Sequence, residues 1–542
     1  MKRQTDGGNS LILKQNDEQR INKTLFGLLI ISALIRGFLA AWLEFGNDEV
    51  YYWTYSKFPD WSHFDHPGMV GWVIQLFSFN LLFDSEFFIR LSSVIFMTAN
   101  TYIIFRIGKE IKDAQAGLYA AFLYTASIYA FVITGIFIMP DTPMSFFWLL
   151  GFWMFAKYFT AAPTKNLHLF LAGFFSGLCI LSKYTGVFLW VGAGLYILIF
   201  NRKTLKNPTL YLALLISAIC CIPILYWNYH NDFISFSFHS DRISLFAKPT
   251  FNYIGTELAG EFFYNNPVNF VLTIIAIIAS IKNKIEVSKA TKRLLLLTTL
   301  PMIFLFWFFA LTRATLPHWS APAYVLLILL IACHLQDKKA KQTQLFGLPK
   351  AINAAVIVAA CVAIIGSLEI KTGFIPLDKH TEELKIGRDD FTIDMYGWRQ
   401  LGEKFATFRQ EKIEEGIMSE DDQIVASEWF PAANLDYYVA RPLGMEVFGI
   451  GTPQSIHKYL WINDIRGGFE IGDSFWFLSD SRYYKDPKEV YRWGNFEKTE
   501  LLGIIPIERC GKTAKNFFVF KCENLLYCPK GLDEMKAENK FK

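Results

Sequence analysis

Long apolar segments recur through the first 368 residues of this 542-residue chain, and they constrain its fold more than any other feature. A transmembrane helix needs about 20 consecutive apolar residues. Segments of that length or slightly shorter predict a polytopic α-helical membrane protein with about 11 transmembrane helices. The segments are 24–43, 87–105, 114–133, 142–156, 167–181, 185–200, 209–227, 266–281, 294–311, 317–335 and 351–368.

Basic residues are concentrated in alternate loops between these segments. The loops 1–23, 106–112, 157–165, 202–206, 282–293 and 338–350 are rich in Lys and Arg. Because cytoplasmic loops carry the excess of Lys and Arg, these loops are predicted to be cytoplasmic and the others extracytoplasmic. The predicted outer loops contain only Lys57, Lys183, Arg242, Lys248 and Arg313.

The apolar run 67–83 is the ambiguous case. If it crossed the membrane, every later loop would change sides and the charge bias would reverse. We therefore expect 67–83 to form an interfacial or re-entrant helix on the outer side. The first segment, Thr24 to Leu43, is followed by no small-residue cleavage site, so it is expected to remain as a transmembrane helix.

The composition changes after Leu368. Residues 369–542 are charged and mixed, with short strand-like runs such as QIVASEWF and FFVFKC. A stretch of about 170 residues is long enough for one α/β domain with its own core. We expect a transmembrane domain over 1–368 and an extracytoplasmic domain over 369–542. The latter contains Cys510, Cys522 and Cys528, a trio that can form one disulfide of unassigned pairing.

Unusual polar clusters all fall in the predicted outer loops. The loop 46–67 reads GNDEVYYWTYSKFPDWSHFDHP, and further clusters occur in IMPDTPM, LSKYTG, FHSDR and TRATLPHW. Charged groups at membrane depth are costly and are usually functional. Their place near one face of the bilayer suits a lipid-borne substrate, because a transporter is expected to place such groups near the midplane. The charged residues are Asp48, Glu49, Asp60, Asp65, Asp141, Lys183, Asp241, Arg242 and Arg313, with His63, His66, His239 and His318 beside them.

Structural roles compete with functional ones at each position. Asp48 and Asp141 both stand where a helix N-cap is expected. Lys183 and Arg313 could extend along apolar surface to the membrane edge. His318, next to Trp319, is typical of an interface anchor.

The ordered set GNDEVYYW, FDHPGMVGW, RLSSVIF, IMPDTPMSFFWLL, GFFSGLCILSKYTGVFL and HWSAPAYVLL resembles the membrane glycosyltransferases of the protein O-mannosyltransferase superfamily. The bacterial branch of this superfamily includes the aminoarabinose-to-lipid-A transferase. The resemblance spans about residues 24–335. It implies a C-type glycosyltransferase fold and inverting transfer of a sugar from polyprenyl phosphate, undecaprenyl in most bacteria. The acceptor would be an exported lipid, glycan or protein at the outer face of a bacterial cytoplasmic (inner) membrane.

The resemblance also implies roles for single residues. Asp48 matches the catalytic acid of the first outer loop, and Asp141 resembles the second acid. Asp65 and His239 match metal-binding positions, which implies a divalent metal such as zinc, magnesium or manganese. His66 and Arg242 fall near the donor phosphate. Two positions depart from the lipid A branch: His66 replaces Lys, so its contact with phosphate depends on protonation, and Tyr51 replaces Arg.

The chemistry needs a base and a set of cations. A carboxylate can take the proton of an acceptor hydroxyl, and Asp48 is the candidate; toward a phosphate acceptor it would only orient. Cations must stabilise the leaving polyprenyl phosphate. The candidates for that role are Lys183, Arg242, Arg313 and His66.

Two other functions stay open at this point. A transporter or flippase for a lipid-linked glycan would carry out no covalent chemistry, and an inactive relative would only bind polyprenyl lipid. The sequence indicates no nucleic-acid partner. It identifies neither the sugar nor the acceptor.

Overall fold

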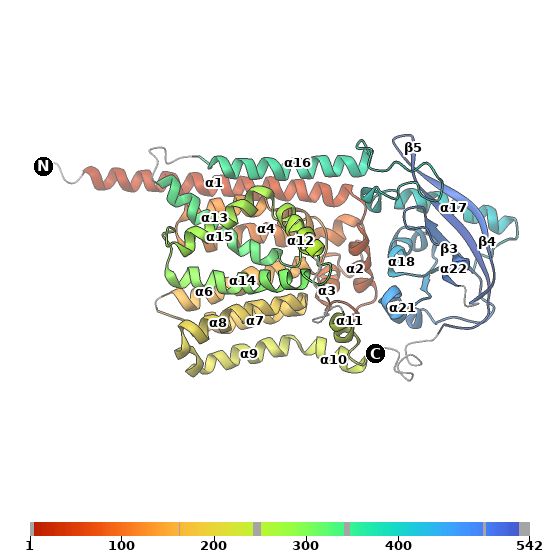
Figure 1. The fold of residues 1–542 in the computed structure, drawn as a ribbon, viewed down its shortest axis with the longest axis horizontal. Coiled ribbons are helices and arrows are strands. Elements are labelled where there is room, and N and C mark those ends of the chain that lie inside the picture. Colours follow the sequence, from red (N-terminus) through yellow and green to blue (C-terminus); the bar gives the residue numbers. More distant parts are fainter. Residues whose placement is uncertain (1–4, 162, 242–250, 341–346, 492–494, 530–542) are drawn as a thin grey trace.

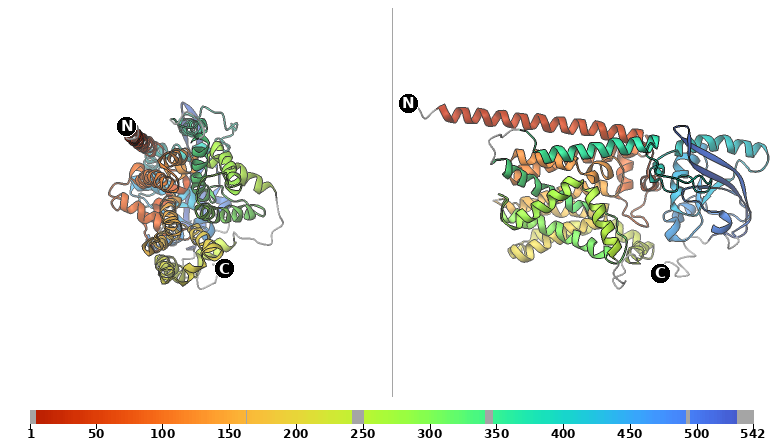
Figure 2. Two further views of the ribbon diagram at one scale, coloured as in Figure 1. Left: turned by 90° about the vertical axis from the view of Figure 1, so that its left-hand side faces the viewer. Right: turned by 45° about the horizontal axis from the view of Figure 1, so that its top comes forward.

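The computed structural model describes residues 5–161, 163–241, 251–340, 347–491 and 495–529. A long helical bundle and an α/β domain lie end to end, with the α/β domain following the bundle in the chain (Figure 1). Helices α1 (Thr5–Trp42) and α16 (Lys350–Thr372) approach each other at their ends nearest the α/β domain, where Lys371 lies over the Trp42 ring at 5.6 Å (Figures 1 and 2).

Helices occupy every apolar segment predicted from the sequence, singly or as broken pairs. Five helices are long and apolar enough to cross a membrane, and two bent pairs raise this number to as many as seven among the described residues. The total of about 11 spans stays a prediction. The helices of the bundle are α1 (Thr5–Trp42), α2 (Asn47–Lys57), α3 (Met69–Phe77), α4 (Glu86–Ile111), α5 (Ala114–Thr125), η1 (Tyr129–Ile133), α6 (Asp141–Thr160), α7 (Asn166–Ser182), η2 (Tyr184–Val187), α8 (Phe188–Phe200), η3 (Arg202–Lys206), α9 (Pro208–Cys220), α10 (Ile222–His230), α11 (Ile234–Asp241), α12 (Phe251–Tyr264), α13 (Pro267–Ile281), α14 (Lys289–Ala310), α15 (Ala321–Ala340) and α16 (Lys350–Thr372).

The run 67–83 forms only a short helix, α3, of 9 residues. At 1.5 Å per residue it spans about 14 Å, whereas the hydrocarbon core is about 30 Å thick. Its length agrees with the expectation that this run does not cross the membrane.

The predicted inner and outer loops separate to opposite ends of the bundle. The start of α1 and the helix ends that flank the links α4–α5, α6–α7, α8–α9, α13–α14 and α15–α16 lie at the end away from the α/β domain (Figure 1). Helices α2, α3 and α11 lie at the other end, next to that domain (Figure 1). The polar outer-loop segments carried by α2, α3 and α11 are therefore brought to one end of the bundle, at its junction with the α/β domain.

The α/β domain is built on a five-stranded sheet of order β2-β1-β3-β5-β4. Strand β1 pairs in parallel with both β2 and β3, and β5 pairs antiparallel with β3 and β4. The strands are β1 (Gln423–Ala426), β2 (Val447–Gly449), β3 (Phe475–Asp480), β4 (Phe496–Arg509) and β5 (Lys512–Leu525); the helical elements are η4 (Phe391–Met395), α17 (Trp398–Glu414), α18 (Trp429–Leu435), η5 (Asp436–Ala440), α19 (Arg441–Leu443), α20 (Pro453–Ile456), α21 (Tyr459–Ile465) and α22 (Pro487–Val490).

Alternate residues of these strands enter two different apolar cores, as the two-residue repeat of a strand requires. Val425, Phe475 and Phe477 pack on one face of the sheet. Ile424 and Trp476 pack on the other face, in a core that continues without a break into α2. The α/β domain and the polar end of the bundle therefore share one hydrophobic core.

Polar contacts strengthen this junction. The Trp398 amide donates to Glu44 Oε2 at 2.8 Å, Arg399 pairs with Glu86 at 2.6 Å, and Lys57 pairs with Asp436 at 3.3 Å. The bonds join the α/β domain to the ends of α1, α2 and α4, so that domain is fixed over the polar loops.

The cysteines form no disulfide in the described structure. All eight, including Cys510, Cys522 and Cys528, are free, and Cys522 is buried in the sheet.

Candidate functional site

Helix α2 carries Asp48 at its first turn. The helix begins after Gly46, which has an extended backbone conformation, and the Glu49 carboxylate accepts a hydrogen bond from the Gly46 amide at 2.9 Å. Glu49 therefore closes the N-terminus of α2, as the third residue of a capping box does. The capping role considered for Asp48 from the sequence belongs to Glu49.

Glu49 also forms a buried ion pair that organises the site. Its two carboxylate oxygens accept from Nε and Nη2 of Arg90, both at 2.6 Å. Arg90 donates as well to the carbonyls of Leu43 at 2.6 Å and Glu44 at 2.9 Å, and Glu49 accepts from the Ile138 amide at 3.1 Å. One buried pair thus joins the end of α1, the start of α2 and the loop that leads to Asp141.

Asp141 and Lys183 form a second buried ion pair. Lys183 Nζ lies 2.7 Å from Asp141 Oδ2, and the Tyr129 hydroxyl donates to Asp141 Oδ1 at 3.0 Å. Pro140 is the N-cap of α6, so Asp141 does not serve as the cap. Lys183 is 6% exposed and points into the protein, so it does not extend to the membrane edge.

Asp65 is surrounded by aromatic side chains. Its carboxylate accepts hydrogen bonds from the hydroxyls of Tyr51, at 2.9 Å, and Tyr55. Its backbone carbonyl lies 2.8 Å from Nε2 of His239. The His239 and His66 rings are 6.3 Å apart. The structure therefore brings Asp65, His66 and His239 together, although α11 and the 58–66 loop are far apart in sequence.

The residue types around Asp65 suit a zinc-like ion, which takes nitrogen and oxygen ligands. His66 Nδ1 is buried and makes no hydrogen bond within the described residues. However, the Asp65 carboxylate is engaged by two tyrosines, and Nε2 of His239 faces a backbone carbonyl. A metal held by Asp65 and His239 requires these hydrogen bonds to be exchanged, and it stays a prediction.

Asp48 is in contact with solvent, and the pKa of its side chain is nevertheless raised. The residue is exposed, yet burial among protein atoms, Asp65 and Glu49 together raise its pKa to about 6. This combination places the carboxylate in a recess of the protein. Lys183 and Asp141 are also close enough to act on its charge. The predicted residues Asp48, Asp65, Asp141 and Lys183 thus form one electrostatic cluster.

The other predicted phosphate-binding residues are His66, Arg313 and Arg242. Burial lowers the pKa of His66 to about 3, so this side chain is neutral at physiological pH. Arg313 lies over the rings of Phe309, at 5.2 Å, and Trp319, at 5.9 Å. Arg242 lies outside the described residues. Among the predicted phosphate-binding cations in the described residues, Lys183 is the one that lies beside the acidic residues Asp48 and Asp141.

The α/β domain contributes side chains that the sequence did not indicate. Lys458 Nζ donates to the Phe58 carbonyl and lies 3.0 Å from Nδ1 of His63. The Trp429 ring lies 5.0 Å from the Tyr51 ring and is stacked on His457. Trp429 begins α18, and His457 and Lys458 lie between α20 and α21, about 400 positions after α2, so no local pattern marks them. They form a cover over the 51–66 region.

We predict that Lys458→Met loosens the 58–66 loop. The change keeps the side-chain length but removes the donor to Phe58 and His63, and a buried polar group without its partner costs about 1–3 kcal/mol. Amide hydrogen exchange in residues 58–66 should accelerate by roughly 5- to 150-fold, because local opening becomes easier. The matched control is Lys498→Met, which removes an exposed lysine of β4. Equal exchange in the two variants would contradict the role assigned to Lys458.

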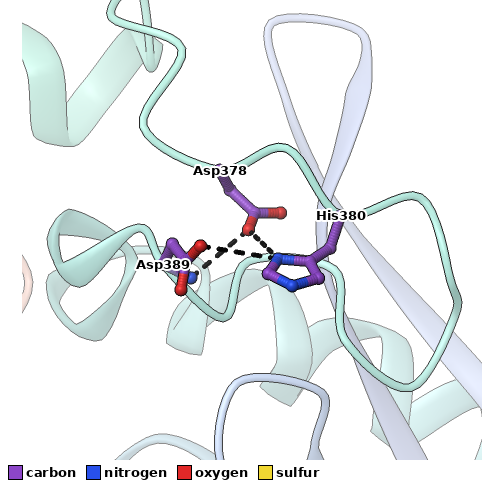
Figure 3. A group of neighbouring side chains, drawn as sticks. All are labelled: Asp378, His380 and Asp389. Carbon is purple, nitrogen blue, oxygen red and sulfur yellow. Dashed lines mark hydrogen bonds and ion pairs between the residues drawn. The ribbon is translucent and has the colours of Figure 1, made fainter.

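A second polar group lies in the α/β domain, formed by Asp378, His380 and Asp389 (Figure 3). His380 Nδ1 is 2.9 Å from Asp378 and 3.7 Å from Asp389. Asp378 also accepts from the amides of Gly387 and Asp389, at 2.8 and 3.3 Å. These bonds close the 378–389 loop on itself, and we assign the group this structural role.

Comparisons with known proteins agree with the sequence resemblance. The family model described as dolichyl-phosphate-mannose-protein mannosyltransferase matches residues 65–227. The lipid A galacturonosyltransferase RgtD of Rhizobium johnstonii is 22% identical over 285 residues, which are 52% of this chain and 59% of that protein. This chain therefore matches only about three fifths of its relative's length.

The solved structures of ArnT from Cupriavidus metallidurans are similar over almost the whole chain. The structure bound to undecaprenyl phosphate has a TM-score of 0.58 at 11% identity, and it covers 92% of this chain and 98% of ArnT. The apo structure has a TM-score of 0.56 at 12% identity, with the same coverage. The predicted C-type glycosyltransferase fold is confirmed, as is the resemblance to the protein O-mannosyltransferase superfamily.

Proposed function

We propose, from this chain's similarity to the protein O-mannosyltransferase superfamily, that it is an inverting glycosyltransferase that uses a polyprenyl-phosphate sugar. The observation that carries the proposal is the cluster of Asp48, Asp141 and Lys183 at one end of a bundle with the C-type glycosyltransferase fold. Such a cluster offers a base for the acceptor and a cation for the leaving phosphate.

The donor side depends on Lys183. Its ammonium group would stabilise the negative charge that develops on the phosphate as the sugar leaves. Asp141 holds that ammonium group by an ion pair, and the Tyr129 hydroxyl donates to Asp141 and so fixes its carboxylate. Arg242, Arg313 and His66 are the further candidates for phosphate contact. The undecaprenyl phosphate bound to ArnT supports a lipid donor of the same class, undecaprenyl phosphate carrying a sugar.

The acceptor side depends on Asp48. Its carboxylate accepts the proton of an acceptor hydroxyl while the acceptor oxygen forms a bond to the anomeric carbon. The bond between that carbon and the phosphate oxygen breaks, and its electron pair leaves with the polyprenyl phosphate. Attack opposite the leaving group inverts the anomeric centre. A divalent ion such as zinc, magnesium or manganese, held by Asp65 and His239, would add positive charge near the phosphate.

The arrangement of charge supports an orientation in the bacterial cytoplasmic (inner) membrane. The helix ends that flank the basic loops lie at the end of the bundle opposite the α/β domain (Figure 1), and basic loops mark the cytoplasmic side. We therefore infer that the site and residues 369–542 are extracytoplasmic. From that position the α/β domain would help to select an exported lipid, glycan or protein acceptor.

A transporter or flippase is the less favoured function. Transport sites are expected near the bilayer midplane, between the two halves of a repeat. Helix α2, which carries Asp48, instead lies at the end of the bundle next to the α/β domain (Figure 1), and Lys458 of that domain donates to the Phe58 carbonyl just after α2.

We predict an unusual pH dependence of sugar transfer. Because the pKa of Asp48 is raised to about 6, the base is protonated below that pH and ionised above it. The kcat/KM of transfer should rise about tenfold per pH unit up to pH 6 and then level off, whereas an ordinary Asp would level off near pH 4. The measurement is transfer from extracted donor lipid by membrane vesicles containing the chain. A rate that stays constant from about pH 7 to pH 4 would contradict Asp48 as the base.

A further inference from the structure

A crevice opens in the α/β domain where strands β1 and β3 end. It is a shallow depression, open to solvent, and the space of about 360 Å³ at its walls includes that open solvent. Polar and aromatic side chains line it together, which is the mixture found at small-ligand sites. The lining residues are Ala426, Ser427, Glu428, Phe430, Pro431, Phe477, Leu478, Ser479, Asp480, Tyr483 and Lys485.

The topology of the sheet explains why the crevice lies there. Strand β1 stands between β2 and β3, and all three are parallel. The connection from β1 leads outward to β2, and the next connection crosses to β3 on the opposite side of β1. After β3 the chain continues to β4, which lies beyond β5 on the side away from β2, so it leaves the carboxyl ends of β1 and β3 in opposite directions. Ligands of open α/β sheets bind at such switch points.

The charges of the crevice indicate the chemistry of its ligand. Lys485 pairs with Glu428 at 2.5 Å, and the lining residues include two acids, Glu428 and Asp480, against this one lysine. Asp480 is 4% exposed and accepts from the Tyr483 amide at 2.8 Å. Behind the crevice, Arg482 is paired with Asp394 at 2.8 Å and Lys515 donates to the Ile393 carbonyl at 3.0 Å. The crevice has no surplus of positive charge, which disfavours phosphate and favours ligands that donate hydroxyl groups.

Aromatic surface completes this environment. The Tyr483 side chain is 43% exposed at the crevice, and its ring stands 5.4 Å from the Phe430 ring in an edge-to-face arrangement. A sugar ring has an apolar face that can pack on an exposed aromatic ring, while its hydroxyl groups donate to carboxylates and serine oxygens. Glu428, Asp480 and Ser427 provide those acceptors.

The crevice also shares a wall with the candidate site. Phe430 and Pro431 line the crevice, and the preceding residue, Trp429, packs on Tyr51 of α2. Tyr51 in turn donates to Asp65. Helix α18 begins at this wall and lies against α2 (Figure 1). A molecule bound in the crevice is therefore next to the segment that covers the 51–66 region.

We propose that this crevice binds a hydroxyl-rich, unphosphorylated carbohydrate portion of the acceptor. The proposal rests on the proposed glycosyl transfer, because it assigns the crevice to the acceptor of that reaction. It names a neutral or amino-bearing glycan as the ligand class and places the recognition in the α/β domain, apart from the reacting groups.

Glycan binding by the full chain in lipid nanodiscs tests this proposal. The probes are three sets of arrayed bacterial envelope oligosaccharides, one neutral, one amino-bearing and one phosphorylated. We expect binding to the first two sets. Tyr483→Ala and Glu428→Gln should each weaken it at least about tenfold, as expected for loss of a buried aromatic contact or of a hydrogen bond to a charged group. The matched control is Glu500→Gln, which removes the exposed acid of another 2.5 Å ion pair.

The outcomes separate this proposal from the proposed function. Asp48→Asn should keep glycan binding while losing sugar transfer. If the wild-type chain transfers no sugar but binds glycans in a way that depends on the crevice residues, the proposed glycosyltransferase function is wrong and the glycan-binding assignment of the crevice is supported. Absence of glycan binding by the wild-type chain, binding of phosphorylated glycans alone, or equal binding by Glu428→Gln and Glu500→Gln would overturn the crevice assignment. Tyr483→Phe, which keeps the ring, should bind more tightly than Tyr483→Ala.

Discussion

Asp48→Asn is expected to lower sugar transfer by about 10²- to 10⁴-fold, the contribution usual for a positioned general base. Asparagine has the same shape as aspartate but cannot accept the proton of an acceptor hydroxyl. Asp48 is suited to this role because its carboxylate retains solvent contact while burial, Asp65 and Glu49 raise its pKa to about 6. A base with that pKa is ionised at neutral pH and still has a useful affinity for a proton.

The fold should survive this change. Glu49, and not Asp48, closes the N-terminus of α2 and pairs with Arg90. The thermal midpoint of Asp48→Asn in detergent should therefore match that of the wild-type chain. Asp389→Asn, at an exposed carboxylate in the 378–389 loop, is the control for an Asp-to-Asn change as such. Transfer by Asp48→Asn at more than about a tenth of the wild-type rate is incompatible with a base for a hydroxyl acceptor.

Arg90→Met is expected to destabilise the chain by about 3–5 kcal/mol, because it leaves the buried Glu49 charge without its partner. The side chain of Arg90 is fully buried, and its guanidinium group also donates to carbonyls at the end of α1. Loss of this group leaves acceptors unsatisfied in two segments, the end of α1 and the start of α2. The thermal midpoint in detergent, measured beside that of wild type, reports the effect.

A double variant separates charge from packing. Glu49→Gln combined with Arg90→Met removes the uncompensated charge, so part of the lost stability should return, although the carbonyls of α1 remain unpaired. Lys498→Met breaks an exposed pair on β4 and should cost at most about 1 kcal/mol. If Arg90→Met lowers the thermal midpoint no more than Lys498→Met does, the organising role of the Glu49–Arg90 pair is wrong.

The helical bundle could be predicted from the sequence because each apolar segment is a local signal. Helices occupy every predicted segment. The alternating charge bias predicted that 67–83 is an interfacial or re-entrant helix and not a span, and in the structure this run forms only a short helix. The same bias assigned the polar clusters to one side. This is why Asp48, Asp65, Asp141 and Lys183 could be grouped before their contacts were known.

The parts that could not be predicted depend on contacts between distant residues. Lys458 and Trp429 reach the 51–66 region from a domain about 400 residues later, and nothing in their local sequence marks them. Arg90 is different. It is a single arginine inside the apolar segment 87–105, and an isolated charge there indicates a buried partner. That signal could have identified the Glu49–Arg90 pair.

The most direct test of the proposed transfer is mass spectrometry of envelope lipids, glycans and proteins. The comparison uses cells with the wild-type chain, cells without it, and cells with Asp48→Asn. We predict that one envelope component loses the mass of a sugar both without the chain and with Asp48→Asn, which would also identify the acceptor class. If no component changes mass and no polyprenyl-phosphate sugar accumulates, the glycosyltransferase account is contradicted and a transporter becomes the better explanation.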